Sequence, residues 1–236
     1  MLPLRDENTS SLRPLASYFF ILINFAVFLL ESSDTERMSA SACSYGFIHS
    51  ASLEEALLNS HRLLASIFPH AGWIHFLRNM PYFFTSGDDV EAALGNVNYV
   101  ISYSISGVSA NVMRTVFSQV KRALMNVPDV GSSGAISGVP GAYFISYPNA
   151  RVITLILIPH SVTLRPLPAK RTLRFWFVLK MIPALVPIDS WSAAYWTHVG
   201  ECLLVRVLLA FPQRVKAGCL RIQLTGRNSH WRNRCV

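Results

Sequence analysis

An uncharged apolar run from Pro14 to Leu30, reading PLASYFFILINFAVFLL, constrains this chain more than any other feature. A helix needs about 20 mostly apolar residues to cross a bilayer. Such a run can satisfy its backbone polar groups in lipid only as a helix. The polar stretch from Arg5 to Asn8 precedes the run, and no small-residue cleavage site follows it. We therefore interpret the run as a retained first membrane span and not as a cleaved signal.

The composition extends this interpretation to the whole chain. Hydrophobic residues make up 51% of the 236 residues, charged residues only 14%, and the mean hydropathy is +0.34. Soluble domains carry roughly 25% charged residues, so the composition excludes a disordered chain and favours a polytopic membrane protein over a soluble globule. The four cysteines lie far apart in the sequence and form no CxxC or close Cys/His pair. A zinc site or a disulfide framework is therefore not expected.

Apolar runs predict six membrane spans, joined by a long first loop after the first of them. The expected spans are residues 14–30, 67–85, 97–117, 131–147, 173–188 and 191–211. Only the first is apolar enough to stand out by hydropathy alone. The segment 152–159 is apolar but too short to cross, so we expect it to be interfacial or re-entrant. The predicted fold class is an all-α polytopic membrane protein with a six-helix bundle and a long external first loop.

The distribution of charge orients these spans through the positive-inside rule. The tail after Phe211 and the connection between the fourth and fifth spans contain basic residues and no acid, whereas the long first loop is mostly acidic. Both termini are therefore expected in the cytoplasm. Arg114, Lys121 and Arg122 lie near a loop that this orientation places outside, against the majority of the charges. The net charge of +8 is thus mainly topogenic, and nucleic-acid binding is not expected.

Polar side chains inside the expected spans are candidates for function because they are costly in lipid. The second span contains His70, His75 and Asn79, and the last two are four residues apart on one helical face. Each could instead form a hydrogen bond between helices.

The fourth span opens with Gly131, Ser132, Ser133 and Gly134, and the sixth contains His198. Small residues of the GxSG type also serve close helix packing. Together, however, a serine and a neutral imidazole supply the nucleophile and the base that acyl transfer requires. His75 and Asn79 would then supply hydrogen-bond donors to an oxyanion.

Other classes of membrane protein lack their motifs in this sequence. No HExxH is present for a zinc protease, and Gly87–Asp88 lacks the GxGD pattern of aspartyl intramembrane proteases. No charged path or broken-helix symmetry of a transporter is evident, although a transporter fragment stays a third alternative. We expect no metal and no cofactor.

The chain resembles the rhomboid family of intramembrane serine proteases over roughly residues 1–211. The resemblance rests on motifs in the expected order: the LRDEN opening at residues 4–8, HRLL at 61–64, HAGWIHFLRNM at 70–80, GDDVE at 87–91, the GxSG serine and the late His-Val-Gly. It implies that Ser133 is the nucleophile and His198 the general base. It also implies that His75, Asn79 and the backbone N–H of Ser133 form the oxyanion hole, with His70 and Gly131 supporting the site.

The resemblance further implies a water-filled cavity and cleavage of transmembrane protein substrates near their outer ends, after small residues. The expected protein is a serine endopeptidase of a bacterial-type plasma membrane, with a membrane domain at residues 1–213 and a basic cytoplasmic tail at 214–236. Glu201 stands where the family usually has a second glycine, and Arg206, Arg78 and His61 also depart from the pattern. These departures leave an alternative open, a catalytically impaired protein that binds membrane clients without cutting them.

Overall fold

The computed structural model describes residues 1–8, 13–32, 35–48, 60–120, 128–129, 132–158 and 161–185. The helices in these ranges are α1 (Leu15–Ser32), α2 (Thr35–Tyr45), α4 (Arg62–Ala65), α5 (Trp73–Leu94), α6 (Asn96–Val120), α7 (Ser132–Ser146) and α8 (Ala169–Leu185). The strands are β1 (Leu2–Asp6), β2 (Phe47–Ile48), β3 (Pro128–Asp129), β4 (Arg151–Ile158) and β5 (Ser161–Pro168). The protein is thus mostly helical, but the expectation of an all-α fold missed two small sheets.

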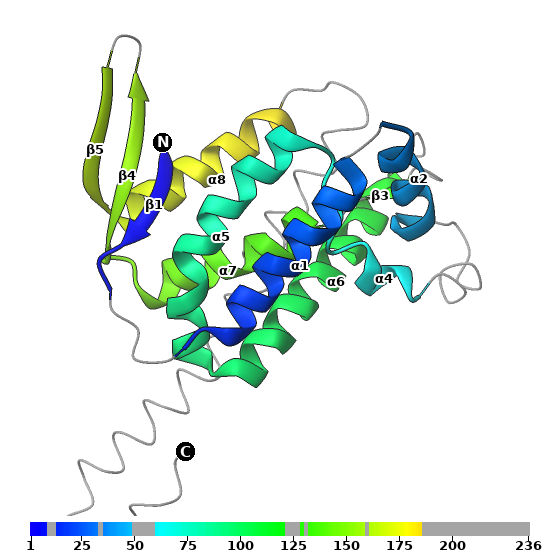
Figure 1. The fold of residues 1–236 in the computed structure, drawn as a ribbon, viewed down its shortest axis with the longest axis horizontal. Coiled ribbons are helices and arrows are strands. Elements are labelled where there is room, and N and C mark those ends of the chain that lie inside the picture. The colour runs from blue at the N-terminus through cyan, green and yellow to red at the C-terminus, as the bar shows by residue number, and fades with distance from the viewer. Residues whose placement is uncertain are drawn as a thin grey trace, which may run out of the picture.

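Helices α1, α5, α6 and α7 pack together, with α8 beside α7 and the sheet of β1, β4 and β5 at one end (Figure 1). Four of the six expected spans coincide with α1, α6, α7 and α8 to within a few residues at each boundary. Of the described helices, α1 alone is long and apolar enough to cross a membrane by itself, with a mean hydropathy of 1.8. The expected sixth span, 191–211, lies outside the described residues.

Helix α5 begins and ends later than the expected second span, 67–85, and its last two turns contain Asp88, Asp89 and Glu91. Glu91 is 1% exposed, and its carboxylate accepts the backbone N–H groups of Ala16 (2.9 Å) and Ser17 (2.7 Å). These N–H groups belong to the first turn of α1, where no intrahelical acceptor exists. A carboxylate at a helix N-terminus is also favoured by the helix dipole. Glu91 therefore caps one helix from within another, which explains how α5 buries a charged stretch.

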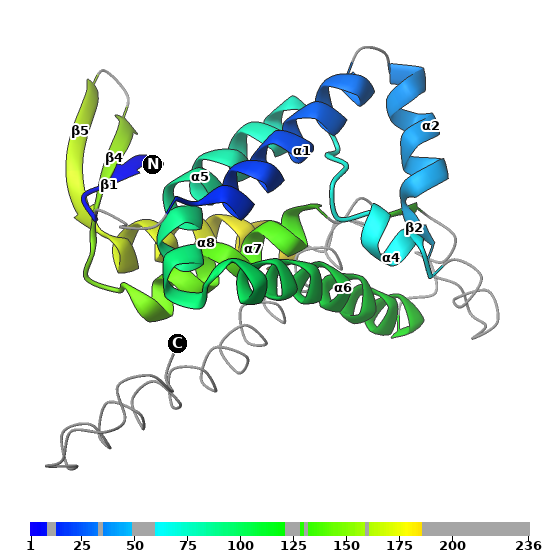
Figure 2. The ribbon, with the colours of Figure 1, turned by 60° about the horizontal axis from the view of Figure 1, so that its bottom comes forward.

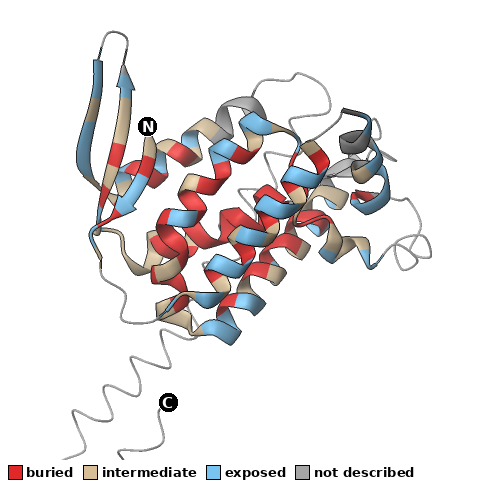
Figure 3. Ribbon diagram, in the orientation of Figure 1, coloured by how far each residue is buried: buried red, intermediate tan, exposed pale blue. Residues whose placement is uncertain are grey.

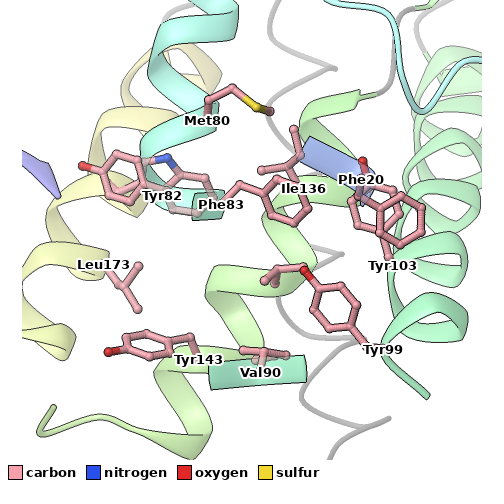
Figure 4. Close-up of a cluster of buried hydrophobic side chains, with 14 of the residues drawn as sticks. Phe20, Met80, Tyr82, Phe83, Val90, Tyr99, Tyr103, Ile136, Tyr143 and Leu173 are labelled. Carbon is pink, nitrogen blue, oxygen red and sulfur yellow. The ribbon is translucent and has the colours of Figure 1, made fainter. Parts of the chain in front are cut away.

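Aromatic and aliphatic side chains from α1, α5, α6, α7 and α8 form the core (Figure 4). Two series of labelled residues run from one end of this cluster to the other (Figure 4). On α5 the order is Met80, Phe83 and Val90, and on α7 it is Ile136 and then Tyr143. The ring of Phe20 in α1 stacks on Tyr103 of α6 with centroids 4.1 Å apart. Burial is concentrated on α5 and α7 (Figure 3), and every described residue of α7 from Ser132 to Pro140 is buried. Because the labelled residues of α5 and α7 follow the same direction in Figure 4, these two helices run in parallel. Their N-terminal turns therefore lie at the same end of the bundle.

Gly107 is the point of close approach between α6 and its neighbours. A Cβ atom at this position would overlap Cγ2 of Ile67 and lie 3.1 Å from Cβ of Ala135 on α7. Ile67 is 2% exposed and β-branched, so it has little room to move. We expect Gly107→Ala to lower the free energy of unfolding by about 1–3 kcal/mol, the usual cost of overpacking a core.

The measurement is thermal unfolding of the detergent-purified protein. Ser102→Ala serves as the matched control, since Ser102 lies on the same helix and is only partly buried. Alanine normally stabilises a helix relative to glycine by about 1 kcal/mol. A higher unfolding midpoint for Gly107→Ala would therefore show that this approach is not tight.

A buried acidic cluster joins β1 to α5 and α7. The hydroxyl of Tyr143 donates to Oδ2 of Asp6 (2.9 Å), and the side-chain amide of Asn8 donates to Oδ2 of Asp89 (2.7 Å). Asp6 and Asp89 are 6% and 3% exposed. Burial first, and then the neighbouring carboxyl of Asp89, raises the pKa of Asp6 to about 8. The folded protein therefore holds a proton in this cluster that the unfolded chain releases.

This proton predicts a pH dependence of stability. The folded pKa of Asp6 lies above its ordinary value of 3.8, so its contribution is fully present below that value and is lost as the pH rises to about 8. The free energy of unfolding should fall across this window by at most about 1.4 kcal/mol per pH unit from this group. Unfolding midpoints between pH 5 and 9 should show a shallower decline for Asp6→Asn than for wild type. Glu7→Gln removes an exposed carboxyl next in sequence and should leave the slope unchanged; equal slopes for all three proteins would contradict the assignment.

The chain from Arg151 to Pro168 forms a β-hairpin of β4 and β5, and β1 pairs with β4 on its other edge, all antiparallel. The apolar segment 152–159, expected to be interfacial or re-entrant, is thus mostly a strand. Thr154 is fully buried, and its hydroxyl lies 3.2 Å from that of Thr172 on α8. This contact fixes one face of the hairpin to the helical body.

The first loop contains helices α2 and α4, and α2 stands apart from the bundle beyond the end of α1 (Figure 2). Arg62 donates from Nη1 to the carbonyl of Cys43 (2.9 Å), joining α4 to the end of α2. On α6, the side-chain amide of Asn111 donates to the carbonyl of Leu63 (3.1 Å) and to Oγ of Ser66 (2.9 Å). The part of the loop that leads into α5 is therefore anchored to the bundle.

Candidate functional site

The segment from His70 to Asn79 carries three of the expected site residues. Gly72 has φ of +133°, a conformation that side chains disfavour, and it lets the chain turn sharply into α5. The turn returns the ring of His70 to that of His75, with centroids 5.5 Å apart. His70 is 1% and Asn79 0% exposed, whereas His75 is partly exposed. The structure therefore brings two histidines together and buries Asn79 one turn beyond them.

Hydrogen bonds determine which ring nitrogen carries the proton in neutral His70 and in neutral His75. The backbone N–H of Ala71 donates to Nδ1 of His75 (3.3 Å), so a neutral His75 carries its proton on Nε2. Nδ1 of His70 lies 3.0 Å from the carbonyl oxygen of Phe68 and must donate to it, because a carbonyl only accepts. A neutral His70 therefore has a lone pair on Nε2. His75 is thus prepared as a donor and His70 as an acceptor.

Aromatic side chains from α1 and α5 enclose the buried His70. The ring of Phe28 stacks on Phe76 at a centroid distance of 4.4 Å, and His70 meets Phe76 edge-on at 5.0 Å. Phe28 also contacts Trp73 edge-on at 4.7 Å. The apolar walls hold the imidazole in one orientation and shield it from lipid and solvent.

Ser133 lies in the first turn of α7, which begins at Ser132. It is 8% exposed, and its carbonyl accepts a hydrogen bond from Oγ of Ser137 (2.5 Å). Backbone N–H groups in a first helical turn lack intrahelical acceptors and favour negative charge. The local structure around Ser133 can therefore stabilise an oxyanion.

The N-terminal turns of α5 and α7 lie at the same end of the bundle. His75, Asn79 and Ser133 therefore all lie toward that end. His198 and Gly131, the other two expected site residues, lie outside the described residues. Among described residues, no cluster of three or more His, Cys, Asp or Glu side chains suits a metal ion. The described part of the candidate site thus consists of a serine and polar side chains, with no metal-ligand set among the described residues.

Sequence reasoning missed the contribution of α1 to this region. Phe28 contacts His70, and the buried carboxylate of Glu31 accepts from the hydroxyl of Ser41 and lies beside the backbone of His70. More than 35 residues separate α1 from His70, and no spacing in the sequence links them. The Ala71–His75 hydrogen bond, by contrast, joins residues four apart and could have been inferred from a helix start near Gly72.

Comparison with known proteins places these features in a family. The model of the Rhomboid domain matches residues 58–211, which is more than half of the chain. The mitochondrial rhomboid protein 1 of Saccharomyces cerevisiae is 24% identical over 142 residues, which cover 60% of this chain and 39% of that protein. The putative rhomboid protease YdcA of Bacillus subtilis is 33% identical over 82 residues, which cover 35% of this chain and 39% of that protein.

A chloroplastic rhomboid-like protein 11 of Arabidopsis thaliana is 26% identical over 135 residues, covering 57% of this chain and 43% of that protein. The matched region thus spans about two fifths of the length of each of these relatives. The domain match contains α5, α6 and α7, with the paired histidines, Asn79 and Ser133. On this evidence the chain belongs to the rhomboid family of polytopic helical integral membrane proteins.

Proposed function

We propose that the protein is an intramembrane serine endopeptidase that cleaves transmembrane protein substrates with a dyad of Ser133 and His198. The observation that carries the proposal is a buried serine in the first turn of α7, at the end of the bundle where His75 presents an Nε2–H donor. Membership in the rhomboid family adds support, since one relative is described as a putative rhomboid protease.

The proposed reaction is an acyl transfer in two steps. Oγ of Ser133 attacks the carbonyl carbon of the scissile peptide while His198 takes the hydroxyl proton. The carbonyl oxygen becomes an oxyanion that accepts from Nε2–H of His75, the side-chain amide of Asn79 and the backbone N–H of Ser133. His198 passes the proton to the leaving amine, and the C–N bond breaks to leave an acyl-enzyme. Water then attacks the ester with His198 again as base, and the carboxylic acid and free Ser133 are released.

The proposed topology has six spans, the sixth at residues 191–211, with a membrane domain at 1–213 and a cytoplasmic tail at 214–236. It places the protein in a bacterial-type plasma membrane with both termini in the cytoplasm. The positive-inside rule supports this orientation, because the tail is basic and lacks acids. A reporter that is active only in the cytoplasm should be active when fused after Val236; activity of an exported reporter there would contradict the orientation.

A catalytically impaired protein that binds membrane clients is the second candidate. Glu201 follows Gly200 where the resemblance leads one to expect a second glycine, and it introduces a carboxylate three residues after His198. The binding function would require the bundle but not the dyad.

The experiment that separates the candidates offers several single-span substrates to the folded wild type in liposomes. Mass spectrometry of the products should show one main cut in or near each substrate's membrane segment, after a small residue. Co-purification of intact substrates with a folded wild type that cleaves none of them would overturn the proposal and support client binding.

A further inference from the structure

The hairpin of β4 and β5 extends past its third strand. Strand β1 pairs with β4 only as far as Leu155, opposite Leu2. Beyond that point the hairpin is a two-stranded ribbon that projects from the helical body (Figure 1). A two-stranded ribbon that does not pack against other structure has little stability of its own in water. The projecting part therefore calls for a surface against which it can pack.

The two faces of the ribbon differ. Val152 and Thr154, which alternate along β4, are buried against the body at 2% and 0% exposure. The opposite face begins with the cross-strand pair of Arg151 and Pro168 at the root of the hairpin. It continues with the pairs Ile153 with Pro166, Leu155 with Leu164, and Leu157 with Val162. Directly paired residues share a face of an antiparallel sheet. The last three of these pairs define the outer face, and their six residues are all apolar, whereas the root of the same face carries Arg151.

The outer face is exposed where it projects most. Leu157, Val162 and Leu164 are 64%, 69% and 58% exposed. Contiguous exposed apolar surface of this kind marks an interaction site or a membrane contact.

Basic residues surround the root of the hairpin. Arg151, Arg171 and Arg174 are exposed, and Lys170 lies on the first turn of α8. Arg165 is also exposed, but it pairs with Thr154 and so lies on the face opposite to the outer face. No Asp or Glu occurs between Asp129 and Asp189 in the sequence. An apolar face with a basic surround complements the apolar interior and anionic headgroups of a lipid surface. A second copy of this chain would instead bring like charges together.

The hairpin is also expected to lie close to the membrane surface. It connects α7 directly to α8, and the protein is an integral membrane protein of the rhomboid family. We infer that the outer face of the β4–β5 hairpin inserts into the headgroup region of the adjoining leaflet, held there by anionic phospholipids on the surrounding arginines. The inference rests on family membership and not on catalytic activity.

The test uses the full chain, with its four cysteines replaced by serine, in nanodiscs of phosphatidylcholine with or without phosphatidylglycerol. An environment-sensitive fluorophore on Val162→Cys should emit at shorter wavelength with phosphatidylglycerol present. Lipids brominated near the headgroup should quench it at least about twofold more than lipids brominated at the chain ends. The matched control is Thr163→Cys, the next residue on the opposite face, which should show a weaker shift and weaker quenching.

Replacing Arg151, Arg165, Arg171 and Arg174 with glutamine should reduce the quenching at position 162, as should raising the salt concentration. Water-like emission without quenching in both lipid compositions would overturn the inference. Energy transfer between labelled copies, without quenching by lipid, would also overturn it and assign the face to self-association. Circular dichroism and gel filtration of each variant exclude misfolding as a cause.

Discussion

Replacing Ser133 with alanine is expected to lower the rate of substrate cleavage by at least about 10³-fold, because the variant lacks the hydroxyl that is proposed to form the acyl-enzyme. The loss should be in kcat, with substrate binding retained. The fold should survive, because alanine has good helix propensity and the site loses only a hydroxyl. The measurement is cleavage of a single-span substrate by folded protein in liposomes.

Ser132→Ala is the matched control for this variant. Ser132 precedes Ser133 in the same helical turn, is fully buried, and its Oγ has no hydrogen-bond partner among the described residues. Removing an unsatisfied buried hydroxyl is close to neutral or stabilising. Cleavage that survives Ser133→Ala but not Ser132→Ala would reassign the nucleophile, and cleavage that survives both would reject it.

Replacing His75 with alanine is expected to lower kcat by about 10²–10³-fold, the usual effect of removing one oxyanion donor. The reason is the hydrogen bond from the Ala71 N–H to Nδ1, which leaves Nε2–H as the donor. KM should change little, because the donor acts on charge that develops only in the transition state. Steady-state kinetics over a range of substrate concentrations separate kcat from KM.

Leu77→Ala is the control for the His75 variant, because Leu77 is an exposed apolar residue two positions away on α5. It should retain cleavage near the wild-type rate. A rise in KM with kcat unchanged in His75→Ala would indicate a role in substrate binding, and would contradict the assignment to the oxyanion hole.

The helices were largely predictable because apolar runs and small-residue patterns mark them directly. The start of α7 at Ser132 lies one residue from the expected start at 131. The end of α5 was not predictable from hydropathy, because Asp89 and Glu91 look like loop residues until their partners are known. Those partners, Asn8 and the N-terminus of α1, lie more than 70 residues away. Local sequence patterns do not reveal hydrogen bonds that buried carboxylates accept from distant parts of the chain.

The sheet escaped prediction for a different reason. Residues 152–158 form an apolar run that only Thr154 interrupts, and periodicity alone cannot distinguish a buried strand from a helical segment. The partner strand β5 contains Pro166 and Pro168, which argue against a strand unless it lies at an edge. It does lie at an edge, because the strand order is β1-β4-β5. Only the three-dimensional pairing reveals why prolines are tolerated there.

The residues of the candidate site were chosen by their type and order in the sequence, and their roles stay predictions. His70, His75, Asn79 and Ser133 were all selected from the sequence, and α5 and α7 carry the last three. The enclosure of His70 by Phe28 was not predictable, since it depends on how α1 packs against α5. The role of His198 stays a prediction, because that residue lies outside the described part of the chain.

We propose above all that Ser133 is a nucleophile activated by His198. The most direct test of this proposal is covalent labelling of the folded, liposome-reconstituted protein with a fluorophosphonate, which phosphonylates an activated serine and releases fluoride. Peptide mass spectrometry should show a single adduct on Ser133 that is absent in Ser133→Ala, retained in Ser132→Ala and formed at least about 10²-fold more slowly in His198→Ala. An adduct on another residue, labelling unaffected by His198→Ala, or no labelling of the folded wild type would contradict it.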